Sequence, residues 1–208
     1  RRQGGVLVAL VAVLIAGGAI LRPIAWTRPA GPAVTVSLVQ SNVSQEEKFD
    51  PAFRPQNYAL HADLVARAKG RIVVLPESAY PQFSDEIPPE VIDGLVAAAR
   101  LRDGMVLTGL FVLLPPAAPG EEERIHNSVV GLSSAAPQLY RKHHLVPFGE
   151  SIPLKGLVGW FINSVLHIPL ADQAAGPALQ PPFVVAGQRL AVNICYEDVF
   201  GGELAIPA

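Results

Sequence analysis

A set of polar side chains that could carry out a reaction each follows an apolar stretch of the sequence. They are Glu77 in LPES, Lys142 and Glu150 in YRKHHLVPFGE, and Cys195 and Glu197 in NICYED. A cysteine can act as a nucleophile, a carboxylate as the base that activates it, and a lysine as a cation that stabilises negative charge in a transition state. A thiol with an ordinary pKa is mostly protonated at neutral pH, so a nucleophilic cysteine needs such neighbours. The set predicts covalent catalysis, provided that the side chains meet.

The positions of these residues favour such a meeting. Taken singly, Cys195 could be a small buried apolar side chain, Glu77 a helix cap and Lys142 a solvated lysine. Each of them, however, follows a segment that we expect to be a strand, and the carboxyl ends of strands are where α/β sheets bind ligands. Burying several charges there costs several kcal/mol per ion unless the charges compensate one another. We therefore expect the side chains to form one cluster.

Signatures of other chemistries are absent from the sequence. It contains no G-x-S-x-G, no Walker A loop, no G-x-G-x-x-G and no H-E-x-x-H. Of the five histidines only His143 and His144 lie close together, and neighbouring side chains on a strand point to opposite faces. We therefore expect neither a metal site nor a cofactor.

The composition narrows the class of protein. The chain has 208 residues, of which 50% are hydrophobic and 16% charged, with a formal net charge of -2. This excludes intrinsic disorder, and the absence of a basic excess argues against binding to nucleic acid. Ordinary soluble domains contain about 25% charged residues. The low charge therefore indicates a large core or a membrane segment.

An apolar run near the N-terminus could be that membrane segment. Residues 6–21 carry no charge and would span about 24 Å as a helix, slightly less than a full membrane crossing. A signal peptide and a buried helix are the alternatives, but Trp26 lies where an interfacial anchor would. Arginines flank both ends of the run, so charge does not orient it. We expect a partial transmembrane helix at residues 1–25 and a linker at 26–33.

The rest of the chain, residues 34–208, reads as one domain. Alternating strands and helices followed by several strands predict an α/β layered domain in which helices cover a sheet. Strands are expected at residues 34–40, 72–75, 105–114, 125–132, 138–142 and 189–194, and helices at residues 53–69 and 88–99. The first strand is expected to be buried because it is rich in β-branched residues.

One further apolar stretch, residues 154–170, interrupts the polar loops near the C-terminus. It is either a helix packed into the core or a flap that lies in the membrane interface. In the second case Trp160 and Phe161 would contact lipid.

The polar motifs resemble, in the same order, the Glu, Lys and Cys motifs of the nitrilase (carbon-nitrogen hydrolase) superfamily. The fuller resemblance is to the bacterial apolipoprotein N-acyltransferase family, through VSLVQSN at 36–42, HLVPFGESIPL at 144–154 and GPALQPPF at 176–183. Leu75 and Ser151 depart from the family's usual residues. The resemblance implies an α-β-β-α sandwich, preceded by the end of a transmembrane helix. Because the family's domain continues beyond the cysteine, we expect a fragment that shows no acyl transfer by itself.

The resemblance also implies catalytic roles. Cys195 would be the nucleophile, Glu77 the general base and then acid, and Lys142 the cation that stabilises the tetrahedral oxyanion. The backbone N–H of Tyr196, next to the nucleophile, would be a second oxyanion donor. Glu150 and Glu197 form a supporting layer that would orient the lysine and the cysteine.

The implied reaction moves a fatty acyl chain from a phospholipid to the N-terminal amine of S-diacylglyceryl-cysteine in apolipoproteins, through a cysteine thioester. The implied location is the bacterial inner membrane, with the catalytic domain on the periplasmic side. One alternative is a soluble or secreted nitrilase-type amidase that acts on small C–N substrates and shares the same three catalytic residues. Another is a noncatalytic membrane-tethered module, in which Cys195 would have no chemical role.

Overall fold

The computed structural model describes residues 2–28, 31–115, 123–147, 149–151 and 173–204. The chain divides into two compact units, residues 1–33 and residues 34–208. The apolar stretch at 154–170, with Trp160 and Phe161, lies outside the described residues, so both interpretations of it stay predictions.

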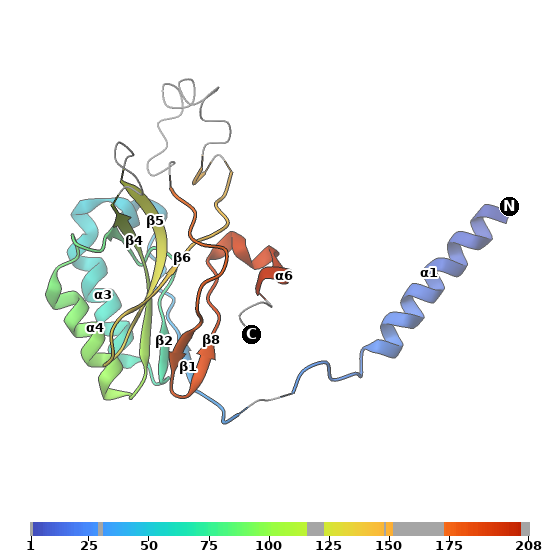
Figure 1. Cartoon of the computed structure of the whole chain (residues 1–208), viewed down its shortest axis with the longest axis horizontal. Coiled ribbons are helices and arrows are strands. Elements are labelled where there is room, and N and C mark those ends of the chain that lie inside the picture. Colours follow the sequence, from blue (N-terminus) through green and yellow to red (C-terminus); the bar gives the residue numbers. More distant parts are fainter. Residues whose placement is uncertain (1, 29–30, 116–122, 148, 152–172, 205–208) are drawn as a thin grey trace, which may run out of the picture. The chain divides into compact units, whose positions relative to one another are not determined.

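The first unit contains one helix, α1 (Arg2–Leu21) (Figure 1). Its 20 residues correspond to about 30 Å. The stretch Gly4–Leu21 has a mean hydropathy of 2.6, so the helix is long and apolar enough to cross a membrane. It is longer than the uncharged run at 6–21, because it begins in the polar residues before that run. The helix ends at Leu21, because Pro23 disfavours helix in the residue before it.

The second unit is built on a six-stranded mixed sheet. Its strands are β1 (Val36–Leu38), β2 (Ile72–Val74), β3 (Tyr80–Phe83), β4 (Met105–Leu114), β5 (Arg124–Leu132) and β6 (Gln138–Arg141). The order is β1-β2-β4-β5-β6, and β3 pairs with β4. Strands β1, β2 and β4 are parallel, whereas β5 runs antiparallel to both β4 and β6. Therefore β2, β4 and β6 run in the same direction, and their carboxyl ends lie at one edge of the sheet.

Helices cover one face of this sheet. They are α3 (Arg54–Arg67) and α4 (Pro89–Leu101), which lie side by side in Figure 1, and they are preceded by α2 (Gln45–Phe49) and a 3-10 turn (Pro51–Phe53). The helices bury Val65 and Leu95 against Val73 and Val106 of the sheet. Arg102, at the end of α4, donates to the carbonyls of Val65 and Ala68 at the end of α3, where helical carbonyls run short of backbone donors.

A hairpin covers the other face of the sheet. It consists of β7 (Phe183–Val185) and β8 (Gln188–Leu190), and its Phe183 and Val185 pack on Ile72, Met105 and Leu107. The described residues thus form a helix layer, a sheet layer and a second sheet layer. This confirms the expected sandwich, with the far helix layer incomplete. The described part ends with a 3-10 helix, η2 (Cys195–Val199), and α6 (Gly201–Leu204).

Two strand predictions differ from the structure. Val36 and Leu38 of β1 are exposed rather than buried, because β1 is an edge strand and a β-branched pattern does not reveal which face is covered. The strand expected at 189–194 instead begins at Gln188 and ends at Leu190. Ala186 and Gly187, both with positive φ, form a tight two-residue turn that fixes where this strand starts.

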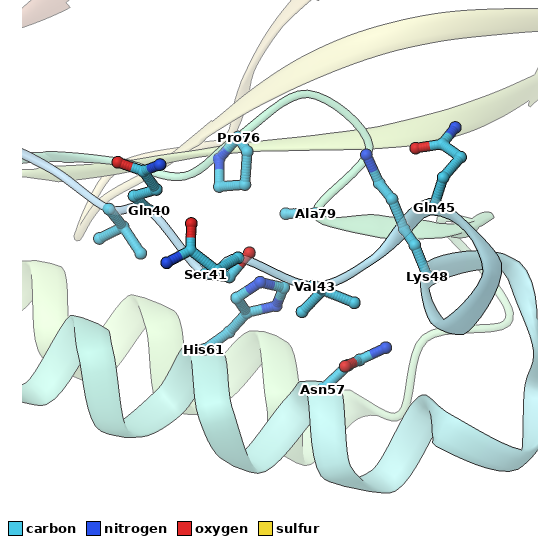
Figure 2. A pocket seen from close by; sticks show the side chains of 11 residues that line it. Gln40, Ser41, Val43, Gln45, Lys48, Asn57, His61, Pro76 and Ala79 are labelled. Atoms are coloured by element: carbon cyan, nitrogen blue, oxygen red, sulfur yellow. The ribbon is translucent and has the colours of Figure 1, made fainter.

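A buried histidine gives the helix layer a pH dependence. His61 of α3 is only 2% exposed, extends toward the loop after β1 (Figure 2), and meets the ring of Tyr80 edge-on at 5.3 Å between centroids. Burial, with a smaller effect from the charge of Lys48, lowers the pKa of His61 from 6.5 to about 4. Below pH 6.5 the unfolded chain therefore binds a proton that the folded chain does not.

We expect the folded state to lose about 3 kcal/mol from this group as the pH falls from 6.5 to about 4. His61→Phe keeps a ring against Tyr80 and removes the titration. Urea unfolding of both proteins in detergent at pH 7 and pH 4.5 measures the difference. The substituted protein should lose less stability on acidification, and equal losses would show that His61 is not the source.

Candidate active site

Glu77 and Lys142 meet at the edge of the sheet where β2 and β6 end. Glu77 lies three residues beyond β2, and Lys142 follows β6 directly. Because the two strands run in the same direction, their carboxyl ends bring both side chains to one edge. The Lys142 Nζ lies 3.6 Å from the Glu77 Oε1. The first carboxylate and the cation of the expected cluster are therefore neighbours.

Glu150 holds Lys142 from a second side. Its Oε1 lies 2.7 Å from the Lys142 Nζ, and its Oε2 accepts a hydrogen bond of 2.9 Å from the backbone N–H of Val146. The lysine side chain is 1% exposed. Such a buried cation is tolerated when carboxylates compensate its charge, and Lys142 has two of them.

Asn127 of β5 is a member of this cluster that the sequence did not reveal. Its Nδ2 donates to the Glu77 Oε1 at 2.7 Å and to the Glu150 Oε1 at 3.5 Å. The backbone carbonyl of Asn127 accepts a hydrogen bond from the backbone N–H of Lys142 at 2.8 Å. Asn127 thus contacts all three charged residues and fixes both carboxylates relative to the lysine. A polar HNS within an apolar strand was the signal that could have identified it.

The chain around Glu77 approaches β4 closely. A Cβ on Gly109 would lie 2.5 Å from the backbone nitrogen of Ser78, so only glycine fits there. Ser78 itself has φ of 45°, a strained backbone conformation for a side-chain-bearing residue. The Glu77 carbonyl accepts from the Lys48 Nζ at 2.7 Å. Burial lowers the pKa of Lys48, and the charge of Glu77 partly opposes that effect.

Cys195 begins η2 with φ of 50°, and its side chain is exposed. A non-glycine residue in this left-handed region costs about 1–3 kcal/mol, and such strain is often found at functional sites. Cys195 lines a cavity of about 690 Å³ together with Glu77, Asn127, Lys142 and Glu150. The cavity therefore unites a thiol, two carboxylates and a cation. The segment before Cys195 is extended but is not the paired strand that the sequence predicted.

Glu197 joins the turn of Cys195 to the chain that follows Lys142. Its Oε1 accepts from the backbone N–H groups of His143 at 2.7 Å and His144 at 3.2 Å, and its Oε2 accepts from that of Ile194 at 2.8 Å. The hydroxyl of Tyr140 donates to Oε1 at 2.9 Å, and burial together with Glu197 raises the pKa of Tyr140.

Tyr196 stands between Cys195 and Glu197, and its ring meets Phe200 edge-on at 5.3 Å between centroids. The part that its backbone N–H would take in oxyanion binding stays a prediction.

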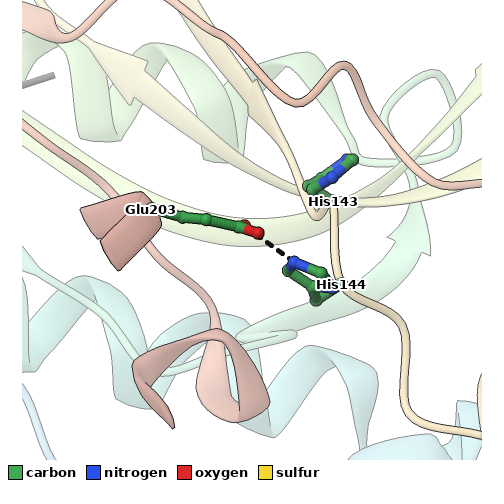
Figure 3. A group of neighbouring side chains, drawn as sticks. All are labelled: His143, His144 and Glu203. Carbon is green, nitrogen blue, oxygen red and sulfur yellow. Dashed lines mark hydrogen bonds and ion pairs between the residues drawn. The ribbon is translucent and has the colours of Figure 1, made fainter. Parts of the chain in front are cut away.

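The histidine pair lies in a different arrangement from the expected one. His143 and His144 follow the end of β6, and their rings contact edge-on at 4.7 Å between centroids (Figure 3). The argument that their side chains point to opposite faces was therefore wrong. With Glu203 they place three possible metal-ligand atoms within 4.8 Å of one another. All three side chains already have partners, because His144 Nε2 pairs with Glu203 at 2.7 Å and His143 Nδ1 with the Gly176 carbonyl at 2.8 Å. The absence of a metal stays a prediction.

The cavity has the groups that acyl transfer through a thiol requires. A carboxylate can take the thiol proton, and a buried ammonium can stabilise a developing oxyanion, where a low local dielectric makes it effective. The sequence-predicted Glu77, Lys142, Glu150 and Cys195 all line this space, whereas Glu197 acts on the surrounding backbone.

Comparisons with known proteins complete the description of the site. Residues 23–207 match the carbon-nitrogen hydrolase family. The chain is 42% identical to an apolipoprotein N-acyltransferase from Nitrosomonas europaea over 88% of the chain, and 40% identical to one from Chromobacterium violaceum over 100% of it. It spans 36% and 39% of those proteins. A solved carbon-nitrogen hydrolase from Helicobacter pylori covers 79% of the chain at 18% identity, with a TM-score of 0.45, and 52% of that structure is matched.

Proposed function

Because this chain belongs to the carbon-nitrogen hydrolase family, we propose that it forms part of an apolipoprotein N-acyltransferase. The observation that carries the proposal is the burial of Lys142 between Glu77 and Glu150 in a cavity that Cys195 also lines. This arrangement suits a reaction in which the thiol attacks an acyl carbonyl.

In the first step the Cys195 thiol gives its proton to Glu77 and attacks the ester carbonyl of a phospholipid. The resulting tetrahedral oxyanion is stabilised by Lys142 and by the backbone N–H of Tyr196. The intermediate collapses when the C–O bond breaks, and Glu77 returns the proton to the leaving oxygen. The products are a Cys195 thioester and a lysophospholipid.

In the second step the α-amine of an N-terminal S-diacylglyceryl-cysteine attacks the thioester. The amine loses a proton to Glu77, the C–S bond of the tetrahedral intermediate breaks, and Glu77 returns that proton to the sulfur of Cys195. An N-acylated apolipoprotein leaves the site. Cys195 is exposed in the structure, so a lipid-facing site that limits water would be what protects the thioester from hydrolysis until the amine attacks.

Glu150 and Asn127 are positioning residues in this scheme, because they hold Lys142 and Glu77 rather than the substrate. The apolar helix α1 supports a membrane location. We place the catalytic cavity on the periplasmic side of the inner membrane, where apolipoproteins present their N-termini.

The test is to isolate the acyl-enzyme. The protein that contains this chain is incubated in vesicles of phosphatidylethanolamine with a labelled acyl chain and no apolipoprotein, and the peptide that bears Cys195 is analysed by mass spectrometry. We expect one acyl group on Cys195, released by hydroxylamine and absent from Cys195→Ala. Exposed Asp198→Asn serves as a control on the same turn and should acylate normally. An unmodified Cys195 together with turnover of a small amide would instead support the amidase alternative.

A further inference from the structure

A smaller pocket of about 200 Å³ adjoins the catalytic cavity. It lies between α2, α3 and the loop after β1, and Figure 2 shows the side chains that line it. Its polar wall comes from residues 40–42, Gln45, Lys48, Asn57 and His61. Gln45 and Lys48 also line the catalytic cavity, so the two spaces share a wall. We call this space the Lys48 pocket.

The charge of the Lys48 pocket is positive. None of the described residues that line it is acidic, and Lys48 supplies a cation. The Lys48 Nζ donates to the Glu77 carbonyl, and within the described part of the chain it has no carboxylate oxygen within 4 Å. In contrast, Lys142 is neutralised by two carboxylates. The Lys48 charge is therefore available to an anion, and the partial burial of this cation strengthens such an interaction.

His61 adds an unused hydrogen-bond donor to the same pocket. It is buried, its ring lies next to Val43 and just below Ser41 in Figure 2, and neither ring nitrogen has a partner among the described residues. A neutral histidine offers one N–H donor and one acceptor. A buried polar group without a partner is destabilising, so a ligand that accepts a hydrogen bond from this N–H would recover part of that free energy.

We propose that the Lys48 pocket binds the phosphate group of the donor phospholipid, with Lys48 and His61 as the groups that donate to its oxygens. The inference rests on the proposed function. A phosphodiester is an anion that only accepts hydrogen bonds, which matches a wall with a cation, an imidazole, amides and a hydroxyl but no acid. The volume of about 200 Å³ corresponds to about seven water molecules at about 30 Å³ each, enough for a phosphate group.

The arrangement also fits the geometry of the donor. In a glycerophospholipid only the glycerol backbone separates the phosphate from the ester carbonyl. A phosphate held at the shared wall therefore leaves the carbonyl in the catalytic cavity, where Cys195 lies. After acyl transfer the lysophospholipid keeps its phosphate, so the same contacts hold the leaving group until it is protonated.

Binding is tested with water-soluble probes. Isothermal titration of the protein containing this chain with sn-glycerol 3-phosphate should give saturable binding, and glycerol should give none. Lys48→Met should weaken the binding of sn-glycerol 3-phosphate by about 10-fold or more, because a charge-assisted bond is lost. His61→Phe should weaken it by a smaller factor, and Lys69→Met, on an exposed lysine outside the pocket, should leave it unchanged. Equal binding by Lys48→Met and the unsubstituted protein would overturn the proposal.

Kinetics then distinguish a phosphate subsite from a purely structural role of Lys48. Cys195 is acylated either from phosphatidylethanolamine vesicles or from p-nitrophenyl octanoate, which has no phosphate. Lys48→Met should slow the first reaction by about 10-fold or more and change the second by less than about 2-fold, and Lys48→Arg should restore part of the first rate. If Lys48→Met slowed acylation equally with both acyl donors, Lys48 would act only by holding the Glu77 carbonyl, and the proposal would be wrong.

Two further outcomes separate the source of the anion from the proposed function. Suppose that Lys48→Met and His61→Phe weaken the binding of inorganic phosphate but do not slow the acylation of Cys195 from phospholipid. The pocket then binds phosphate, but it does not bind the phosphate of the donor phospholipid, and that assignment is wrong. If sn-glycerol 3-phosphate binds as expected and neither donor acylates the unsubstituted protein, the proposed function fails and the pocket stands only as a phosphate-ester site.

Discussion

Replacing Lys142 with methionine is expected to slow the acylation of Cys195 by about 1,000-fold. The loss of one oxyanion donor typically costs about 10²–10³ in rate, and Lys142 also compensates two carboxylates that border the cavity. Without the ammonium, Glu77 and Glu150 repel both one another and a thiolate. The rate of thioester formation from labelled phosphatidylethanolamine measures the effect.

The same substitution should also destabilise the fold, because it leaves Glu150 without its cation. Breaking a buried ion pair by removing one partner costs about 3–5 kcal/mol. The double variant Lys142→Met/Glu150→Gln removes the uncompensated charge as well, so it should regain much of the stability but none of the acylation rate. Recovery of both would show that Lys142 acts only through folding, and a full rate in the single variant would contradict its oxyanion role.

The meeting of Glu77 and Lys142 could be predicted from the sequence because both residues follow strands of one direction. Glu77 after β2 and Lys142 after β6 reach the same edge whatever the details of the loops. Long apolar elements such as β4 were also predicted with the bounds they have, because both faces of β4 are covered and its apolar run is continuous.

The parts that escaped prediction depend on long-range packing or on backbone conformation. The polar HNS of β5 marks Asn127 as unusual for an apolar strand, but its partners Glu77 and Glu150 lie outside that strand, so the local pattern does not reveal what Asn127 contacts. The positive φ of Cys195 and the close approach at Gly109 follow from the packed chain, not from residue type. The contact between His143 and His144 was missed because the strand ends one residue before Lys142, where alternation no longer applies.

Glu197→Ala is expected to lower the free energy of unfolding by about 3 kcal/mol or more. The Glu197 side chain is only 4% exposed and receives hydrogen bonds from Tyr140 and from the backbone of His143, His144 and Ile194. Each buried donor that loses its acceptor costs about 1–3 kcal/mol. These bonds fasten the Cys195 turn to the chain after Lys142, so acylation should fall as well.

Glutamine cannot replace this carboxylate, although it has the same shape. One oxygen of Glu197 accepts from Tyr140, His143 and His144, and the other accepts from Ile194. An amide has one oxygen, so in either orientation its NH₂ faces a donor. Glu197→Gln should therefore also be destabilised, by about 1–3 kcal/mol.

Urea unfolding of these variants beside Glu203→Ala separates a buried acceptor from a surface acid. Glu203 pairs with the ring of His144 at the surface, where such pairs contribute about 0–1 kcal/mol. Unfolding of Glu197→Ala at the same urea concentration as Glu203→Ala would show that the Cys195 turn is held by other contacts. If Glu197→Ala unfolds at a lower urea concentration than Glu203→Ala, Glu197 maintains the strained backbone of Cys195. It does so because its hydrogen bonds to the backbone of His143 and His144 oppose relaxation of the turn.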